Sequence, residues 1–212
     1  MTNFIPIFPL GIVVYPGEHL NLHIFEPRYK QMITECSEAG RPFGIPTVID
    51  NKMGDMGTMA EVVEISTVYQ GGEMDVKTKG VKIFRILETV KLVPDKLYGG
   101  AIVTYPDTTE DDGQTELMLK VISAVRQLHQ LLKVDKDFKK PDQELLSYDL
   151  AHHAGLSLEE EYELLGLLHE LQRQEYLKRH LGKVIPMLTE MELLKDKIIL
   201  NGHFKNLSSF DL

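Results

Sequence analysis

The sequence is poor in the features that mark several large classes of protein. It has a single cysteine, Cys36, in 212 residues, which excludes an internal disulfide. It has no uninterrupted apolar run of about 18 residues, the length that suggests a membrane-spanning helix. The N-terminus lacks a basic region followed by a long apolar run, so it does not resemble a signal peptide. These absences predict a soluble, reduced, cytoplasmic protein that does not enter a membrane.

Positive charge is also in short supply. The 23 lysines and arginines are outnumbered by 32 aspartates and glutamates, which gives a formal net charge of −9. Nucleic-acid binding depends on neutralising phosphates with clustered lysine and arginine side chains. The charge balance therefore disfavours a general nucleic-acid surface, although it leaves room for a local basic patch.

The short motifs of common catalytic sites are missing as well. The sequence has no G-x-x-x-x-G-K-[ST] loop, which would cradle phosphates, and no G-x-S-x-G elbow, which would present a nucleophilic serine. His169 and Glu170 begin an H-E-x-x-H zinc motif, but Arg173 occupies the position of the second histidine. We therefore expect no bound metal or other cofactor, and no catalytic residues.

Short extended segments dominate the first half of the chain. Residues 19–24 alternate between apolar and polar, which predicts a half-buried strand, and Pro27 suits the first position of a helix over residues 28–39. Further strands are predicted over residues 43–49, 58–69, 73–78, 81–93 and 99–105, with a polar loop over residues 51–57. Both faces of the 81–93 segment carry apolar side chains, which favours a curved strand in a barrel-like sheet.

The composition changes after the acidic segment 107–114, which we interpret as a linker. Leucine becomes abundant, and helices are predicted over residues 117–132, 145–153 and 157–168, followed by a long helix from Leu177 to Ile198. Pro186 should kink or divide that last helix, and Asn201-Gly202 should stop it. The predicted fold class is α+β, with a β-rich subdomain over residues 1–108, a helical bundle over residues 109–202 and a mobile tail over residues 203–212.

Residues 8–32, FPLGIVVYPGEHLNLHIFEPRYKQM, resemble the opening of the substrate-binding, N-terminal domain of the Lon protease family. The shared pattern is an apolar strand, a P-G turn, an alternating strand and then I-F-E-P-R-Y. Further matches lie at Gly57-Thr58, in the run KGVKIFRI at residues 79–86, and in the leucine-rich C-terminal helices. The resemblance covers nearly the whole chain, and it implies a PUA-like barrel followed by a helical bundle.

The resemblance also implies a function. Lon proteases carry an ATPase module and a Ser-Lys proteolytic module after this domain, and neither fits within 212 residues. We therefore expect a free-standing, non-catalytic and ATP-independent module for protein quality control. It would recognise unfolded polypeptides or a partner protein, with a separate protease or ATPase as a further partner. Extended apolar segments would dock in a groove between barrel and bundle, held by burial and by strand-edge pairing.

The candidate binding residues come from the two motifs that carry the resemblance. Glu26 and Arg28 flank Pro27, where an ion pair could clamp a peptide backbone or could simply organise the helix start. The same two interpretations apply to Arg85. The full set of candidate substrate- or partner-binding residues is Phe25, Glu26, Arg28, Tyr29, Phe84 and Arg85.

Two other classes of function stay open. The PUA-like relation suggests RNA binding, which the net charge disfavours. A hydrolase could use Ser147, His152 or His153 with Asp149, provided that these groups converge around a pocket. A metal site at the His152-His153 pair is disfavoured because adjacent helical residues point about 100° apart. His19 and His23 share a strand face, which we interpret as solvated.

Overall fold

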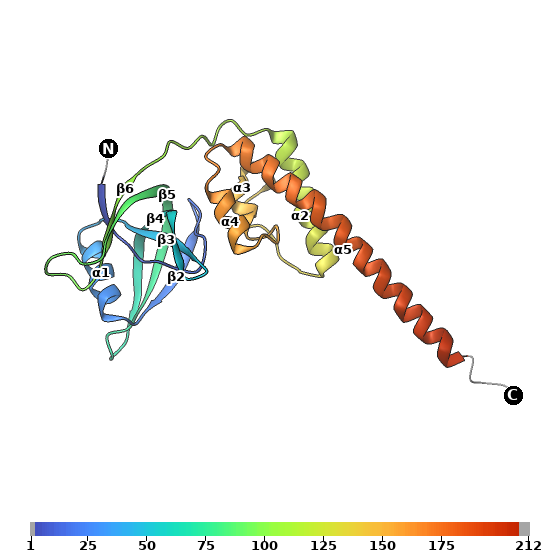
Figure 1. Cartoon of the computed structure of the whole chain (residues 1–212), viewed down its shortest axis with the longest axis horizontal. Coiled ribbons are helices and arrows are strands. Elements are labelled where there is room, and N and C mark those ends of the chain that lie inside the picture. Colours follow the sequence, from blue (N-terminus) through green and yellow to red (C-terminus); the bar gives the residue numbers. More distant parts are fainter. Residues whose placement is uncertain (1–2, 208–212) are drawn as a thin grey trace. The chain divides into compact units, whose positions relative to one another are not determined.

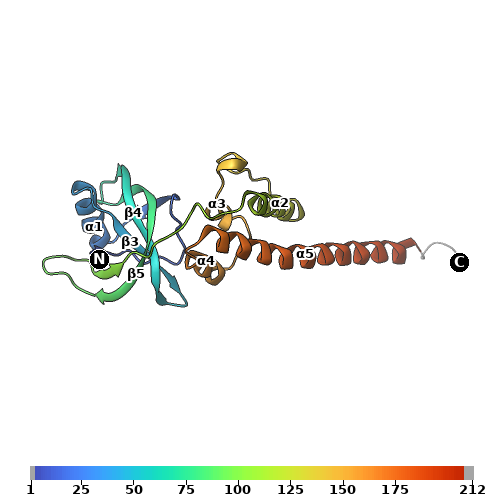
Figure 2. The ribbon, with the colours of Figure 1, turned by 90° about the horizontal axis from the view of Figure 1, so that it is seen from above.

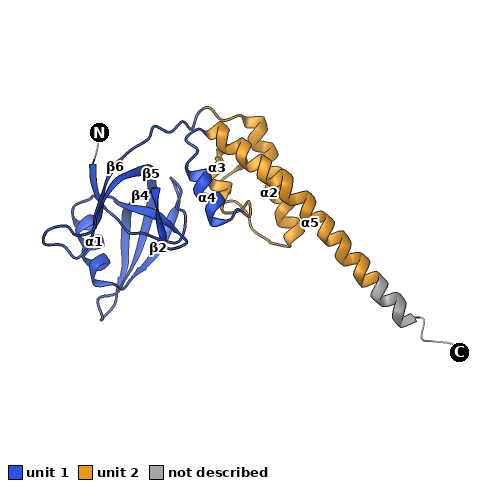
Figure 3. Ribbon diagram, in the orientation of Figure 1, with its two compact units in different colours: residues 1–111, 156–169 blue, residues 112–155, 170–212 orange. Residues whose placement is uncertain are grey.

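The computed structural model describes residues 3–207, with side chains described as far as residue 200, and the chain forms two compact units (Figure 3). The first unit comprises residues 1–111 and 156–169, and the second comprises residues 112–155 and 170–212. The sequence did not predict that helix α4 (Leu158–Leu165) would return to the β-rich unit. A tertiary contact explains it, because the backbone N–H of Met56 donates to the Tyr162 hydroxyl at 3.0 Å.

The first unit is built on an antiparallel sheet (Figure 1). Its strands are β1 (Asn3–Pro6), β2 (His19–Ile24), β3 (Phe43–Ile49), β4 (Lys52–Val68), β5 (Met74–Val90) and β6 (Gly100–Thr104). They lie in the order β1-β6-β5-β4-β3, and β2 pairs with β5. The segment after β1 runs parallel to β3, where the N–H of Phe8 donates to the carbonyl of Gly44 at 2.8 Å. This pairing closes the sheet into the predicted barrel.

Strand β4 starts earlier than the sequence predicts. The polar loop expected over residues 51–57 is wrong, because Lys52 already pairs with Ile49 across a tight turn. Asp50 and Asn51 make that turn with φ values of 48° and 61°, a left-handed conformation that both residue types tolerate. The connection between β3 and β4 is therefore only two residues long.

Strand β5 is one continuous element, although a break was expected at Gly80. A side chain there would collide with the carbonyl oxygen of Tyr15, so this glycine serves a close approach of two backbones. The pairing with β4 also shifts here, from Lys82 opposite Met59 to Gly80 opposite Ala60. Such a bulge bends a strand, which suits a barrel.

Helix α1 (Pro27–Glu38) begins at Pro27, as predicted, and covers the barrel core. Its buried face consists of Met32, Ile33 and Cys36. These side chains join a cluster that includes Phe43 and Val76, each at most 1% exposed. The helical spacing read from the sequence therefore identified the buried face of α1.

The second unit contains α2 (Thr115–Leu132), the short helices η1 (Asp142–Glu144) and α3 (Ser147–Ala151), and the long helix α5 (Glu170–Leu207). Helices α2 and α5 run in the same direction. The N–H of Gln114 donates to the side chain of Gln174 at 2.9 Å, and the side chains of Lys133 and Glu192 lie 3.9 Å apart at the other end. The buried side chains of this unit include Val121, Val125, Leu128, Leu177 and Leu181.

Helix α5 is uninterrupted in both views of the ribbon (Figure 2). Pro186 lies inside it and does not divide it. The carbonyl that loses its hydrogen bond belongs to the exposed Gly182, where water can bind it. The expected stop at Asn201-Gly202 is wrong, since the helix continues to Leu207. Part of the expected mobile tail, residues 208–212, lies outside the described residues. No helix in the described part of the chain is long and apolar enough to span a membrane.

Candidate functional site

A cavity of about 570 Å³ opens in the first unit beside β1, and we call it the β1 cavity. All four residues of β1 line it, together with the C-terminal end of α1, the turn after α1, parts of β4 and β5, and residues between 93 and 105. Its volume lies within the usual range for ligand pockets, roughly 300–1,000 Å³. The cavity is therefore large enough to hold several side chains of a bound molecule.

The floor of the β1 cavity is apolar. Ile5, Cys36 and Met59 line it and are each at most 5% exposed. Burial raises the pKa of the Cys36 thiol to about 11, so the thiol is neutral at physiological pH. Phe4 also lines the cavity but is 47% exposed. The cavity thus offers a dry surface and an accessible aromatic ring.

One carboxylate, that of Glu35, lies among the lining residues, and it is already engaged. It accepts hydrogen bonds from the Lys96 ammonium at 2.9 Å, from the Tyr98 hydroxyl at 2.5 Å and from the Gln31 amide at 3.0 Å. The donors Lys96 and Tyr98 hold the pKa of Glu35 below its ordinary value. Burial, followed by the contact with Glu35, raises the pKa of Tyr98, so both groups keep their usual protonation states at neutral pH.

Three cationic side chains, Arg41, Lys82 and Lys96, line the same cavity. The Lys82 ammonium lies 3.8 Å from the centroid of the Tyr105 ring, a cation–π contact. Among the described residues, Arg41 and Lys82 form no ion pair with a carboxylate. Three cations against one carboxylate make the lining positive, on a chain whose formal charge is −9.

The β1 cavity also lies beside a strand edge. Within the described sheet, β1 pairs through one edge only, with Asn3 opposite Val103 and Pro6 opposite Gly100 on β6. The parallel bridging to β3 begins one residue later, at Ile7. The second edge of residues 3–6 thus carries no strand, and an extended chain can add to such an edge through backbone hydrogen bonds.

The structure brings the predicted residues of the first motif together at the start of α1. Arg28 and Glu26 form an ion pair at 2.7 Å, and the Arg28 guanidinium lies 4.5 Å from the centroid of the Tyr29 ring. Tyr29 packs on Phe8, with 4.2 Å between ring centroids. Phe25, which precedes the helix, is 60% exposed. These residues form a partly exposed cluster, and none of them lines the β1 cavity.

The residues of the second motif are not part of that cluster. Phe84 is completely buried, with 0% of its surface exposed, in a core cluster that includes Ile5 and Met59. A ligand could reach Phe84 only if the barrel opened locally, so its place among the candidate binding residues stays a prediction. Arg85 is half-exposed, 3.8 Å from Asp55. Strand β2 pairs with the opposite end of β5, where Ile24 lies opposite Met74.

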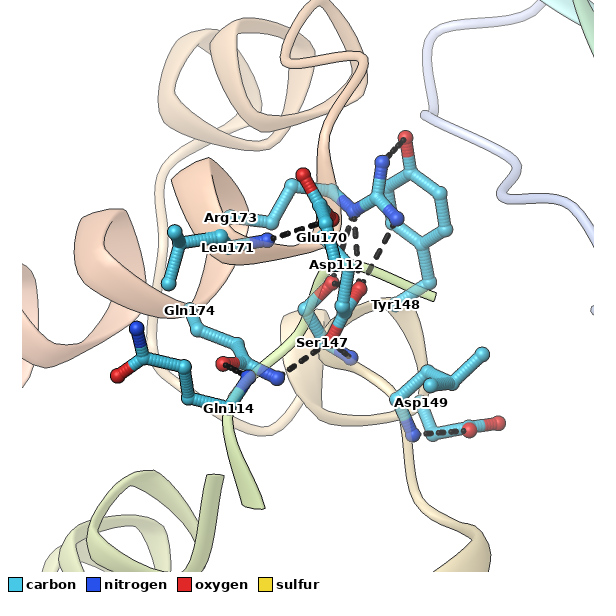
Figure 4. A network of polar contacts seen from close by, with 10 residues as sticks. Asp112, Gln114, Ser147, Tyr148, Asp149, Glu170, Leu171, Arg173 and Gln174 are labelled. Atoms are coloured by element: carbon cyan, nitrogen blue, oxygen red, sulfur yellow. Dashed lines mark hydrogen bonds and ion pairs between the residues drawn. The ribbon is translucent and has the colours of Figure 1, made fainter. Parts of the chain in front are cut away.

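The hydrolase hypothesis concerns a buried network in the second unit (Figure 4). The Ser147 hydroxyl donates to Glu170 Oε2 at 2.6 Å and accepts from Arg173 Nε at 2.9 Å. Glu170 and Arg173 are completely buried and form an ion pair at 2.9 Å. Ser147 is therefore held by the ion pair at the start of α5. Its hydroxyl bonds to Glu170 and Arg173, whereas a nucleophilic serine would bond to a histidine that activates it.

The other residues of the hydrolase hypothesis, Asp149, His152 and His153, make contacts that do not involve Ser147. Asp149 accepts from the backbone N–H of Leu146 at 2.9 Å, which caps α3, and it pairs with Lys140 at 2.7 Å. The His153 ring packs on Phe138 with 5.3 Å between centroids, and burial is the main cause that lowers its pKa to about 4. His152 is exposed. The geometry does not support a hydrolytic site in this region.

The histidines of β2 do not form a metal site either. His23 pairs with Asp75 at 2.7 Å, and both side chains are exposed. His19 is exposed as well. Across the described residues, no three His, Cys, Asp or Glu side chains are grouped so that they could hold a metal ion.

The sequence did not identify the residues of the β1 cavity. Lys82 falls within the KGVKIFRI run, but nothing in its spacing separated it from the surface lysines. Phe4, Arg41 and Lys96 come from segments far apart in the chain, and only the fold brings them to one cavity. Local periodicity carries no signal of such a site.

Comparisons with known proteins agree on one family. The model of the ATP-dependent protease La (LON) substrate-binding domain matches residues 5–183. A crystal structure of a Lon N-terminal domain protein from Xanthomonas campestris is 22% identical with a TM-score of 0.64, and the match covers 82% of this chain and 96% of that one. The N-terminal domain of Mycobacterium avium complex Lon protease is 16% identical with a TM-score of 0.59, covering 85% and 98% of the two chains. These similarities confirm the predicted α+β fold.

Proposed function

This chain belongs to the family of the substrate-binding domain of the ATP-dependent protease La (Lon), and on that premise we propose that it binds unfolded polypeptides in the β1 cavity. The proposed role is non-catalytic and independent of ATP, in the cytoplasm. Proteolysis or unfolding of the bound chain would be the work of a separate protease or ATPase. The proposal thus assigns binding alone to this protein.

The observation that carries this proposal is the position of a cavity with an apolar floor beside an edge of β1 that carries no strand. An extended chain can satisfy its own backbone N–H and C=O groups along β1 while one of its side chains enters the cavity. A folded protein buries most of its apolar side chains and pairs its backbone N–H and C=O groups with one another. The arrangement therefore favours unfolded chains over native ones.

The cluster of Phe25, Glu26, Arg28 and Tyr29 at the start of α1 stays a predicted binding surface, as does Arg85. Its exposed aromatic ring and its ion pair suit a second contact with a partner protein. Within this proposal the cluster is secondary to the β1 cavity, because none of its residues lines that cavity.

Binding of a labelled polypeptide to the full chain tests the proposal. The probe is α-lactalbumin with its disulfides reduced and alkylated to neutral carbamidomethyl groups, compared with native α-lactalbumin. We expect crosslinking to the unfolded form and at least about tenfold less to the native form. Equal crosslinking to both forms would refute the proposal, and displacement of the probe by an RNA oligonucleotide would favour the RNA-binding alternative.

Two variants locate the site. Phe4→Asp places a charge among the lining residues of the β1 cavity, and Phe25→Asp places one at the more exposed ring at the start of α1. We expect the first variant to weaken binding about tenfold, because a carboxylate disfavours an apolar contact. The second should stay within about twofold of the wild type. The reverse order would move the site to the start of α1.

A further inference from the structure

We propose that the β1 cavity selects segments in which an apolar side chain is flanked by aspartate or glutamate side chains. This inference rests on the proposed function and adds a substrate class to it. The apolar side chain would occupy the floor formed by Ile5, Cys36 and Met59. The flanking carboxylates would pair with cations in the lining of the cavity.

The charges in the cavity support this choice of substrate. Lys96 already shares its charge with Glu35, whereas Arg41 and Lys82 have no carboxylate partner among the described residues. The ring of Tyr105 fixes the Lys82 ammonium at 3.8 Å, so its position is set before any ligand arrives. A cation beside an apolar surface attracts a carboxylate more strongly than a cation in open water does. The cavity therefore offers negative groups one cation that a ring holds in place, Lys82, and a second, exposed cation without a carboxylate partner among the described residues, Arg41.

The same observations disfavour a nucleic acid as the occupant. A nucleic acid would need many phosphate contacts and would leave the apolar floor without a partner. The lining also presents the half-exposed ring of Phe4 beside the apolar floor, and this combination suits an aliphatic or aromatic side chain. The chemistry of the cavity is thus mixed, with an apolar floor and cations among its lining residues.

The source of the carboxylates also follows from the distribution of the cations. Arg41 lies after α1, Lys82 lies on β5, and Lys96 lies in the segment between β5 and β6. A chain terminus offers one carboxylate to one position. Cations supplied by three separate segments suit several carboxylates along one polypeptide, so the side chains of an internal segment are the source that we propose.

Fluorescence anisotropy with short labelled peptides tests the inference. The acidic probe GSDLFLDSG carries a C-terminal amide, and its neutral match GSNLFLNSG-amide differs only at the two charged positions. A third peptide, GSNLFL with a free C-terminal carboxylate, supplies the terminal group instead. We expect the acidic probe to bind about tenfold more tightly than either of the others, an effect that two partly exposed ion pairs can provide.

A matched pair of double variants assigns the effect to the cavity. Arg41→Gln with Lys82→Gln should reduce the preference for the acidic probe to less than about threefold, while the neutral peptide binds as before. Lys195→Gln with Lys197→Gln removes two exposed lysines of α5 and should leave the preference unchanged. Circular dichroism of each variant checks that it is folded, and the charge-reversing Lys82→Glu serves as the second test if the double variant unfolds.

Each outcome separates the two proposals. Equal affinity for the acidic and neutral probes would overturn the charge selection and leave polypeptide binding in place. Equal affinity for the acidic probe and the free-carboxylate peptide would overturn the internal source. If no peptide binds and the unfolded α-lactalbumin also fails to bind, the proposed function itself is refuted.

Discussion

The ammonium group of Lys96 lies 2.9 Å from the carboxylate of Glu35, and this ion pair ties the segment between β5 and β6 to helix α1. The backbone N–H of Leu97 strengthens the tie, because it donates to the Gln31 side chain at 2.8 Å. One wall of the β1 cavity is therefore held in place by polar contacts. The same contacts decide how much positive charge the cavity presents.

Replacing Glu35 with glutamine is expected to raise the affinity for the acidic probe by about threefold. The substitution removes the one carboxylate in the lining and leaves the Lys96 charge for the ligand, and a partly exposed ion pair is worth less than about 1 kcal/mol. Anisotropy titrations measure the change. The matched variant Lys96→Gln should lower the affinity by a similar factor, and weaker binding by Glu35→Gln would contradict this account of the cavity.

His153 is expected to make the protein less stable as the pH falls. Its pKa in the folded chain is about 4, lowered first by burial and then by Lys136, His129, His152 and Lys139, whereas an unfolded histidine has a pKa of about 6.5. Between these values only the unfolded chain binds the proton, so stability is complete above pH 6.5 and is lost as the pH falls toward 4. Urea unfolding should show a loss of about 1–2 kcal/mol from this group between pH 7.5 and pH 5.

The variant His153→Leu separates this effect from other titrating groups. The Nδ1 atom of His153 is buried without a hydrogen-bond partner, so leucine removes no hydrogen bond of that atom. We expect His153→Leu to lose less stability than the wild type over the same pH interval. An identical loss in both proteins would assign the pH dependence to other groups.

Cys36 is expected to react slowly with thiol reagents. A thiol with a pKa of about 11 is ionised about one part in a thousand at pH 8, so alkylation should be at least about a hundredfold slower than for a free cysteine. Because Cys36 lines the β1 cavity and is the only cysteine, mass spectrometry of iodoacetamide-treated protein reports directly on the cavity. The acidic probe should slow the reaction further, and rapid labelling that the probe does not change would contradict the site.

Arg173 is expected to be essential for the stability of the second unit. Arg173→Met leaves the carboxylate of Glu170 buried without its partner, which typically costs about 3–5 kcal/mol of unfolding free energy. Arg179→Met, on the exposed side of the same helix, should cost less than about 0.5 kcal/mol. Denaturant unfolding measures both.

The double variant Glu170→Met, Arg173→Met extends this test. It removes both charges together, so it should be more stable than Arg173→Met alone. A single variant within about 1 kcal/mol of the wild type would show that water reaches the pair, contrary to its complete burial.

Local signals in the sequence were sufficient for the elements whose form is decided locally. Pro27 marked the start of α1, and the alternation in residues 19–24 marked β2. Asp50 and Asn51 are residue types that tolerate the left-handed turn they form. In each case neighbouring residues determine the backbone, so the sequence contains the necessary information.

Long-range contacts explain what the sequence did not predict. Gly80 looked like a break, but it is needed where Tyr15 approaches β5. His169 and Glu170 match the start of a zinc motif. In the structure Glu170 instead forms an ion pair with Arg173, which occupies the position of the motif's second histidine. Phe84 was chosen as a candidate binding residue from its motif, and the barrel buries its side chain. The β1 cavity was missed for the same reason, since its lining comes from separate segments.

The most direct test of the account is site-specific photocrosslinking to an unfolded chain. Benzoylphenylalanine at position 4 places the crosslinker among the lining residues of the β1 cavity, and at position 132, where Leu132 is 50% exposed on α2, it serves as the control. With reduced, carbamidomethylated α-lactalbumin, we predict strong crosslinking from position 4 that the acidic probe suppresses, and little from position 132. Equal crosslinking from the two positions, or crosslinking from position 4 that the acidic probe leaves unchanged, would contradict polypeptide binding in the β1 cavity.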